Sequence, residues 1–98
     1  METYLITTKV ELSRQAEKDL GKVPRYIELK LLSWIEAVET QGLEDVRRIP
    51  GYHDEPLKGD RVGQRSIRLS HSYRAIYEVS FDKTVRIVMV LEVTKHAY

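Results

Sequence analysis

The spacing of apolar residues in the first half of the chain predicts a strand followed by two helices. Residues 4–12 are rich in β-branched and aromatic side chains, which is typical of a strand. From Ser13, a favourable N-cap, the apolar residues are spaced as in a helix, and Gly21 weakens that helix near its end. Pro24 suits the first turn of a second helix, whose apolar stripe continues to Gly42. Both helices are expected to cover the apolar face of a sheet.

A long stretch of irregular composition follows. Residues 43–63 are predicted to be largely irregular because glycine and proline recur in them, and only residues 43–49 suit a short helical turn. A connection of this length in a small domain is often functional.

Alternation of apolar and polar residues begins after this stretch and predicts strands at 64–70 and 73–80. The nearly unbroken apolar run at 84–93 predicts a third strand, at the centre of the sheet. In the first, Ser66 and Arg68 are expected on one face of the sheet and Ile67 on the other. The resulting order, β-α-α-β-β-β, predicts an α+β fold in which two N-terminal helices pack on one face of a small, largely antiparallel sheet. With 98 residues, the chain 1–98 is expected to form a single domain.

Composition narrows the possible functions. The chain has no cysteine, which excludes disulfides, thiolate zinc sites and cysteine nucleophiles. No apolar run approaches the roughly 20 residues that span a bilayer, and the first residues lack the basic segment of a secretory signal. A cytoplasmic location without membrane association is therefore expected, and neither a metal nor another cofactor is predicted.

Basic residues gather in one part of a chain whose formal net charge is only +1. Between residues 47 and 74 the acidic residues are Asp54, Glu55 and Asp60, whereas the basic ones are Arg47, Arg48, Lys58, Arg61, Arg65, Arg68 and Arg74. This uneven distribution indicates a confined anionic partner.

The same region contains the residue types needed to cut RNA without a metal. That reaction needs a base for the 2′-hydroxyl, cations for the charged phosphorane and an acid for the leaving 5′-oxygen. The candidates are Glu55 as base, Arg68 and Arg74 as phosphate clamp, and His96 as acid. Tyr98 is a candidate for stacking or for orienting the phosphate, and the predicted RNA-binding residues are Lys58, Arg61, Arg65 and Lys95. Taken alone, each of these residues is of a type that is common on protein surfaces without any function.

The order of these residues along the chain resembles that in the RelE/ParE toxin superfamily, and within it that in the YoeB, RelE and HigB ribonucleases. The resemblance rests on Glu55–Gly59, Arg68, Tyr73–Val79 and Lys95–Tyr98. It implies a type II toxin that cleaves mRNA in the ribosomal A site, where it would also contact ribosomal RNA, and that is silenced by a cognate antitoxin. That antitoxin is expected to carry a DNA-binding domain of the helix-turn-helix kind.

The resemblance also implies roles for individual positions. Glu55 falls at the position of the proposed general base, Arg74 at that of the phosphate-contacting arginine and His96 at that of the proposed general acid. Two departures stand out: Ser66 occupies a position where RelE has a lysine, and Ala97 separates His96 from Tyr98.

Two other functions remain open on the sequence. A ParE-like inhibitor of DNA gyrase would share the fold and cut nothing, but the combined presence of Glu55, Arg74 and His96 would then be unexplained. A binding module without turnover, or a degenerate toxin that only binds its antitoxin, would explain the basic stripe alone.

Overall fold

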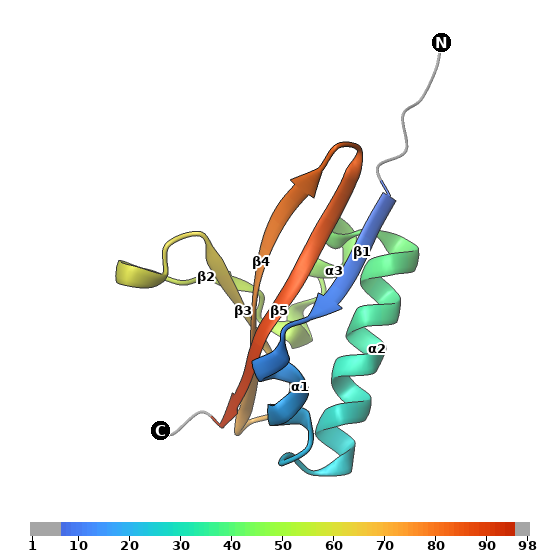
Figure 1. Cartoon of the computed structure of the whole chain (residues 1–98). Coiled ribbons are helices and arrows are strands. Elements are labelled where there is room, and N and C mark those ends of the chain that lie inside the picture. The colour runs from blue at the N-terminus through green and yellow to red at the C-terminus, as the bar shows by residue number, and fades with distance from the viewer. Residues whose placement is uncertain (1–6, 96–98) are drawn as a thin grey trace.

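The first helix follows the first strand directly and lies along the same edge of the sheet. The computed structural model describes residues 7–95, and in it β1 (Thr7–Leu12) leads through the N-cap residue Ser13 into α1 (Arg14–Leu20). The Ser13 hydroxyl accepts a hydrogen bond from the Ala16 N–H (3.0 Å) and donates one to the Leu91 carbonyl (2.6 Å). Asp19 then accepts a hydrogen bond from the Val93 N–H (2.9 Å). Helix α1 therefore continues the edge beside the last strand after β1 has ended (Figure 1).

The second helix, α2 (Arg25–Gln41), supplies the main apolar surface that packs on the sheet. Its buried residues are Ile27, Leu31, Trp34 and Val38, a spacing of four, three and four that matches the period of the helix. Trp34 lies in the core and its ring is 5.2 Å from that of Tyr77, whereas Leu32 is exposed.

The predicted irregular stretch contains several short elements. The helical turn expected at 43–49 is confirmed as α3 (Leu43–Arg47), and two 3₁₀ turns follow, Pro50–Tyr52 and Gly59–Arg61. Between these turns lies β2 (Glu55–Pro56), which pairs with the next strand at the edge of the sheet. This two-residue strand was not predicted from the sequence, because it is too short for an alternating pattern.

The remaining strands complete a five-stranded sheet. They are β3 (Gln64–Arg68), β4 (Tyr73–Asp82) and β5 (Val85–Lys95), and the strand order is β1-β5-β4-β3-β2. Only β1 and β5 run parallel, so the predicted α+β fold with a largely antiparallel sheet is confirmed. No helix within residues 7–95 is both long enough and apolar enough to cross a membrane.

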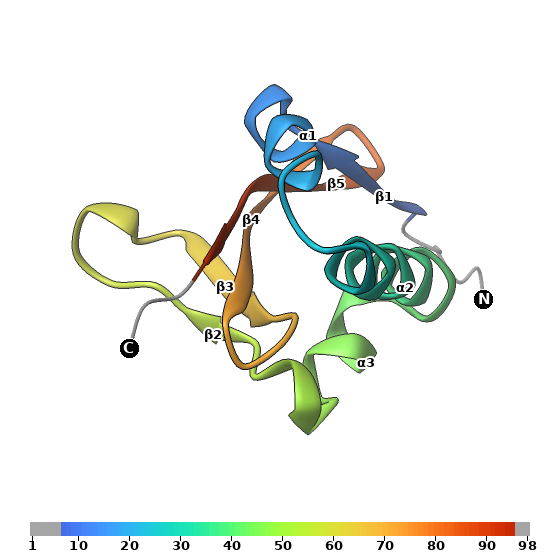
Figure 2. The ribbon, with the colours of Figure 1, turned by 90° about the horizontal axis from the view of Figure 1, so that it is seen from below.

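The two faces of the sheet differ in chemistry. Helix α2 lies over one face of the sheet (Figure 2). The core residues on that face include Ile67, Ala75 and Val93. Cross-strand pairs place a second set of residues on the opposite side, where Ser66 lies beside Ile76, Ile76 beside Glu92, and Arg68 beside Arg74. We call this the arginine face, defined by Ser66, Arg68, Arg74, Ile76 and Glu92.

Candidate functional site

Two arginines lie side by side on the arginine face. Arg68 ends β3 and Arg74 is its direct partner on β4, so both side chains project from the same side of the hairpin. The turn between the strands is held by the Ser70 hydroxyl, which accepts hydrogen bonds from the N–H groups of Ser72 and Tyr73 at 3.2 Å each. Like charges directly opposite each other are destabilising. A fixed pair of this kind is therefore suited to binding an anion.

Arg68 also has an unsatisfied donor. Its Nε is buried and has no hydrogen-bond partner within the described chain. An unpaired buried N–H group is costly, and such groups are rare in folded proteins. An oxyanion placed between Arg68 and Arg74 would supply the missing acceptor and offset the repulsion.

Arg74 is held in place by hydrogen bonds that include those to Ser66 and Glu55. Its Nη1 donates to the Ser66 hydroxyl (2.9 Å) and to Glu55 Oε1 (3.2 Å). Ser66 is fully buried, and the Arg74 side chain is 17% exposed, against 58% for Glu55. Glu55 reaches this position because β2 pairs it with Ser66 in register. The short edge strand thus brings the predicted base to the predicted phosphate clamp.

A third arginine reaches the arginine face from the loop before β3. The Nε of Arg61 donates to Gln64 Oε1 (2.7 Å), and its Nη1 forms an ion pair with Glu92 Oε1 (3.0 Å). Glu92 is a carboxylate that the sequence analysis did not select, although a glutamate within the apolar run of β5 was a visible signal. Its side chain is 28% exposed. Arg61 and Glu92 therefore add one cation and one acid to this surface.

The other predicted RNA-binding residues lie apart from this group. Lys58 is exposed and precedes the turn Gly59–Arg61. Lys95 is the last described residue of β5 and pairs with Tyr73, so it projects from the opposite face to Arg74. His96 and Tyr98, the predicted acid and its neighbour, lie outside the described residues.

Arg65 points to the helix side of the sheet. Its Nε lies 2.6 Å from Asp54 Oδ1, and the Asp54 side chain is only 1% exposed. Burial disfavours the charged form of Arg65, but the hydrogen bond and attraction from Asp54 outweigh it and raise the pKa of Arg65. The structure thus separates Arg65 from the two arginines with which the sequence analysis grouped it.

A buried tyrosine completes the network around Asp54. The Tyr77 hydroxyl donates to Asp54 Oδ2 (2.5 Å) and accepts a hydrogen bond from Arg47 Nε (3.4 Å). Burial and the bond to Asp54 raise the pKa of Tyr77 to about 12, although Arg47 acts in the opposite direction. Tyr77 is therefore a neutral donor at physiological pH.

No metal centre is built from the part of the chain that the structure describes. Within residues 7–95, no group of three or more histidine, cysteine, aspartate or glutamate side chains is placed to hold an ion. The groups on the arginine face are arginines, the carboxylates of Glu55 and Glu92, and the buried Ser66 hydroxyl.

Comparison with known proteins identifies the class to which this fold and surface belong. The family model of ParE toxins of type II toxin–antitoxin systems (parDE) matches residues 10–97. No curated protein matches the chain significantly.

Solved structures of toxins share the fold. The YoeB/ParE toxin from Agrobacterium tumefaciens is 22% identical, with a TM-score of 0.66 over 91% of this chain and 99% of that one. In the complex of DinJ and YafQ from E. coli, the matching chain is 20% identical, with a TM-score of 0.72 over 93% of this chain and 94% of that one. In the archaeal RelE–RelB complex from Pyrococcus horikoshii, the matching chain is 24% identical, with a TM-score of 0.69 over 93% of this chain and 97% of that one.

The chain is thus a small toxin with the RelE-like fold. It belongs to the ParE toxin family of type II toxin–antitoxin systems.

Proposed function

We propose that this toxin is a metal-independent endoribonuclease that cleaves mRNA, with the ribosomal A site as the place of cleavage. The observation that carries the proposal is the Arg68–Arg74 pair, with the Glu55 carboxylate bonded to Arg74. Two arginines that project from the same face of the hairpin can both donate to one phosphate, and they keep their charge throughout the reaction.

In this proposal the Glu55 carboxylate occupies part of the place that a phosphate takes. When the scissile phosphate binds Arg74, it competes with Glu55 for Nη1, which leaves the carboxylate next to the RNA as the base for the 2′-hydroxyl. The 2′-oxygen then attacks phosphorus, and Arg68 and Arg74 stabilise the charge that builds up on the phosphorane. The bond to the 5′-oxygen breaks, and His96 is the proposed donor of its proton. The product carries a 2′,3′-cyclic phosphate.

The surrounding residues bind rather than react. Ser66 fixes the position of Arg74 through the bond from Nη1, which makes it a positioning residue. Lys58, Arg61 and Lys95 are proposed contacts to RNA, and Tyr98 is proposed to stack near the reaction. Arg65 is left out of this surface because its guanidinium is bonded to Asp54, whose side chain is only 1% exposed.

The proposed partners follow from the class of protein and from the charge. A toxin needs a cognate antitoxin, and we propose one with a helix-turn-helix DNA-binding domain. The formal net charge of +1 offers few phosphate contacts, so we propose that cleavage depends on the ribosome and takes place in the cytoplasm.

Cleavage of mRNA on programmed ribosomes, followed by primer extension, tests the proposal. Arg74→Ala is expected to lower the rate about 100-fold or more, because it removes a cation that stabilises the transition state. His96→Gln should also abolish cleavage and growth arrest. The matched control is Arg25→Ala on α2, an exposed arginine remote from this face. If both site variants cut at the normal rate while folded, the assignment is wrong.

Inhibition of DNA gyrase is the second candidate, and the match to the family model of ParE toxins favours it. A gyrase inhibitor would leave mRNA intact and cause an SOS response upon induction. The nuclease predicts the reverse, namely loss of mRNA with undamaged DNA. Measuring both in the same induced culture separates the two functions.

A further inference from the structure

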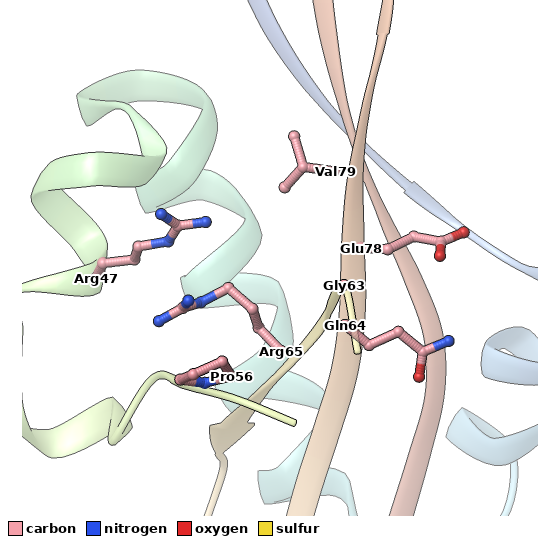
Figure 3. A pocket seen from close by; sticks show the side chains of 7 residues that line it. All are labelled: Arg47, Pro56, Gly63, Gln64, Arg65, Glu78 and Val79. Atoms are coloured by element: carbon pink, nitrogen blue, oxygen red, sulfur yellow. The ribbon is translucent and has the colours of Figure 1, made fainter. Parts of the chain in front are cut away.

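A second cationic site lies on the helix side of the sheet. An open cleft of about 250 Å³ lies between α3, the start of β3 and the second half of β4. Arg47 and Arg65 extend into the same space, with Pro56 and Val79 beside them, whereas the side chains of Gln64 and Glu78 point away from the two arginines (Figure 3). This cleft and the arginine face are on opposite sides of the sheet, because Arg65 and Ser66 alternate along β3.

The charges around the cleft leave an excess of one cation. Asp54 balances Arg65, and its second oxygen accepts the hydrogen bond from the neutral Tyr77. Arg47 donates only its Nε, over 3.4 Å, to the Tyr77 hydroxyl, so both terminal nitrogens of Arg47 lack an acceptor within residues 7–95. The charged groups that point toward the cleft therefore carry a net charge of +1, since Glu78 lines the cleft but points away from the arginines. The nearby Glu44 also attracts Arg47, but its negative charge is balanced by Arg86, which is hydrogen-bonded to its carboxylate.

We propose that this cleft is an anion site that takes a carboxylate side chain from a protein partner, with a neighbouring apolar side chain of that partner packed on Pro56 and Val79. Arg47 would bind the carboxylate through its terminal nitrogens, and Arg65 would add the N–H groups that Asp54 does not use. Only the identity of the partner as the antitoxin rests on the proposed function. The site itself rests on the cleft and its charges.

The surroundings favour a peptide over an RNA strand. The apolar walls at Pro56 and Val79 suit a side chain that follows or precedes an acidic one. An RNA strand bound to Arg68 and Arg74 would run along the other face of the sheet, and β2 lies at the edge between the two faces. Arginine in a partly apolar cleft is also typical of specific protein contacts.

Titration of the full chain with two blocked peptides tests this proposal. The peptides are acetyl-Leu-Glu-Leu-amide and acetyl-Leu-Gln-Leu-amide, which differ only in charge, and the readout is the NMR signal of each arginine Nε–H. We expect the glutamate peptide to shift the signals of Arg47 and Arg65, and the glutamine peptide to bind at least about tenfold more weakly, or ~1.4 kcal/mol. Arg47→Gln should weaken the binding of the glutamate peptide by a similar factor.

The matched control is Arg48→Gln, which removes the neighbouring arginine. Arg48 is 80% exposed and pairs with Asp45, away from the cleft, so its loss should leave peptide affinity unchanged. Thermal unfolding reports whether Arg47→Gln is folded. If it is not, Arg47→Lys serves instead, since it keeps the charge, loses the planar fork and should bind less tightly than the unaltered chain.

Three results would overturn the proposal. They are equal binding of the two peptides, unchanged affinity in Arg47→Gln, and shifts of Arg47 and Arg65 produced by a short 2′-O-methyl oligouridine but not by the glutamate peptide. The last result would assign the cleft to RNA. Because the titration contains neither ribosomes nor cleavable RNA, its failure leaves the proposed nuclease untouched, and failure of the nuclease leaves the anion site untouched.

Discussion

Replacing Arg68 by methionine is expected to stabilise the free toxin while removing its activity. Methionine keeps the aliphatic stem of the side chain and discards the guanidinium. Two unfavourable features disappear with that group, namely the like charge directly opposite Arg74 and the buried Nε, which has no acceptor among residues 7–95. A site built to bind an anion is least stable when the anion is absent.

The size of the effect follows from these two features. Relief of the cross-strand repulsion contributes roughly 0.2–1 kcal/mol. Removal of a buried unsatisfied donor contributes about 1–3 kcal/mol, reduced here because Arg68 is only partly buried as a residue. We therefore expect the free energy of unfolding of Arg68→Met to rise by about 1–2 kcal/mol. For a domain of this size, each kcal/mol raises Tm by about 4–8 °C.

The contrast with Arg74 makes the prediction specific. Arg74→Met relieves the same repulsion but loses the hydrogen bonds to Ser66 and Glu55, so we expect it to lower stability by about 1 kcal/mol. Both variants should fail to cut RNA.

Urea unfolding at low and high salt measures the effect. Salt screens the repulsion between the arginines, so the advantage of Arg68→Met should shrink as salt rises. If Arg68→Met is less stable than the unaltered chain, or if both variants change stability by the same amount, the description of this pair as a strained anion site is wrong.

Three further predictions concern the other charged groups. Asp54→Ala leaves Arg65 without its buried partner and should destabilise the fold by about 3–5 kcal/mol, measured by urea unfolding; a loss under 1 kcal/mol would show that water replaces the carboxylate. The hydrogen bond from Arg86 lowers the pKa of Glu44 from 4.5 to about 2, so its contribution to stability is present above pH 4.5 and is lost as the pH falls toward 2. The stability gap between the unaltered chain and Glu44→Gln should therefore close over that range in unfolding curves, and a gap that is independent of pH would contradict the assignment. Glu92→Gln removes the ion pair of Arg61 and leaves this arginine able to bind a phosphate. The slope of log affinity for a non-cleavable RNA against log salt concentration should then steepen by about 0.7, the value for one added phosphate contact. An unchanged slope would exclude Arg61 from the RNA surface.

The parts of the fold that were predictable from sequence depend on local periodicity. The helices and long strands follow from apolar spacing, and the same alternation placed Ser66 and Arg68 together on one face. Arg65 lies one residue before Ser66, so the same alternation places Arg65 on the other face. The prediction of one basic stripe did not take this difference into account. Charge along a sequence does not show on which face of a sheet the charge lies.

The position of Glu92 could not be derived from alternation. Val88 and Val90 face the core, so a period of two would place Glu92 in the core as well. A β-bulge interrupts the register, so that Tyr77 pairs with Val90 while Ile76 pairs with Glu92. The extra residue, Leu91, turns Glu92 to the arginine face and returns Val93 to the core. A bulge depends on the pairing of two distant strands, which no single segment of sequence reveals.

The buried ion pair on the helix side also helps to define the site on the other side. A shift of β3 by one residue would exchange its faces, sending Ser66 and Arg68 toward the helices and Ile67 toward solvent. The apolar pattern already opposes that shift. Asp54 opposes it further, because it would lose Arg65 and remain buried without a counter-charge. The ion pair between Asp54 and Arg65 on the helix side thus helps to fix the register that places Arg68 opposite Arg74 on the arginine face. The pairing of these two arginines therefore depends in part on Asp54, which lies on the other side of the sheet.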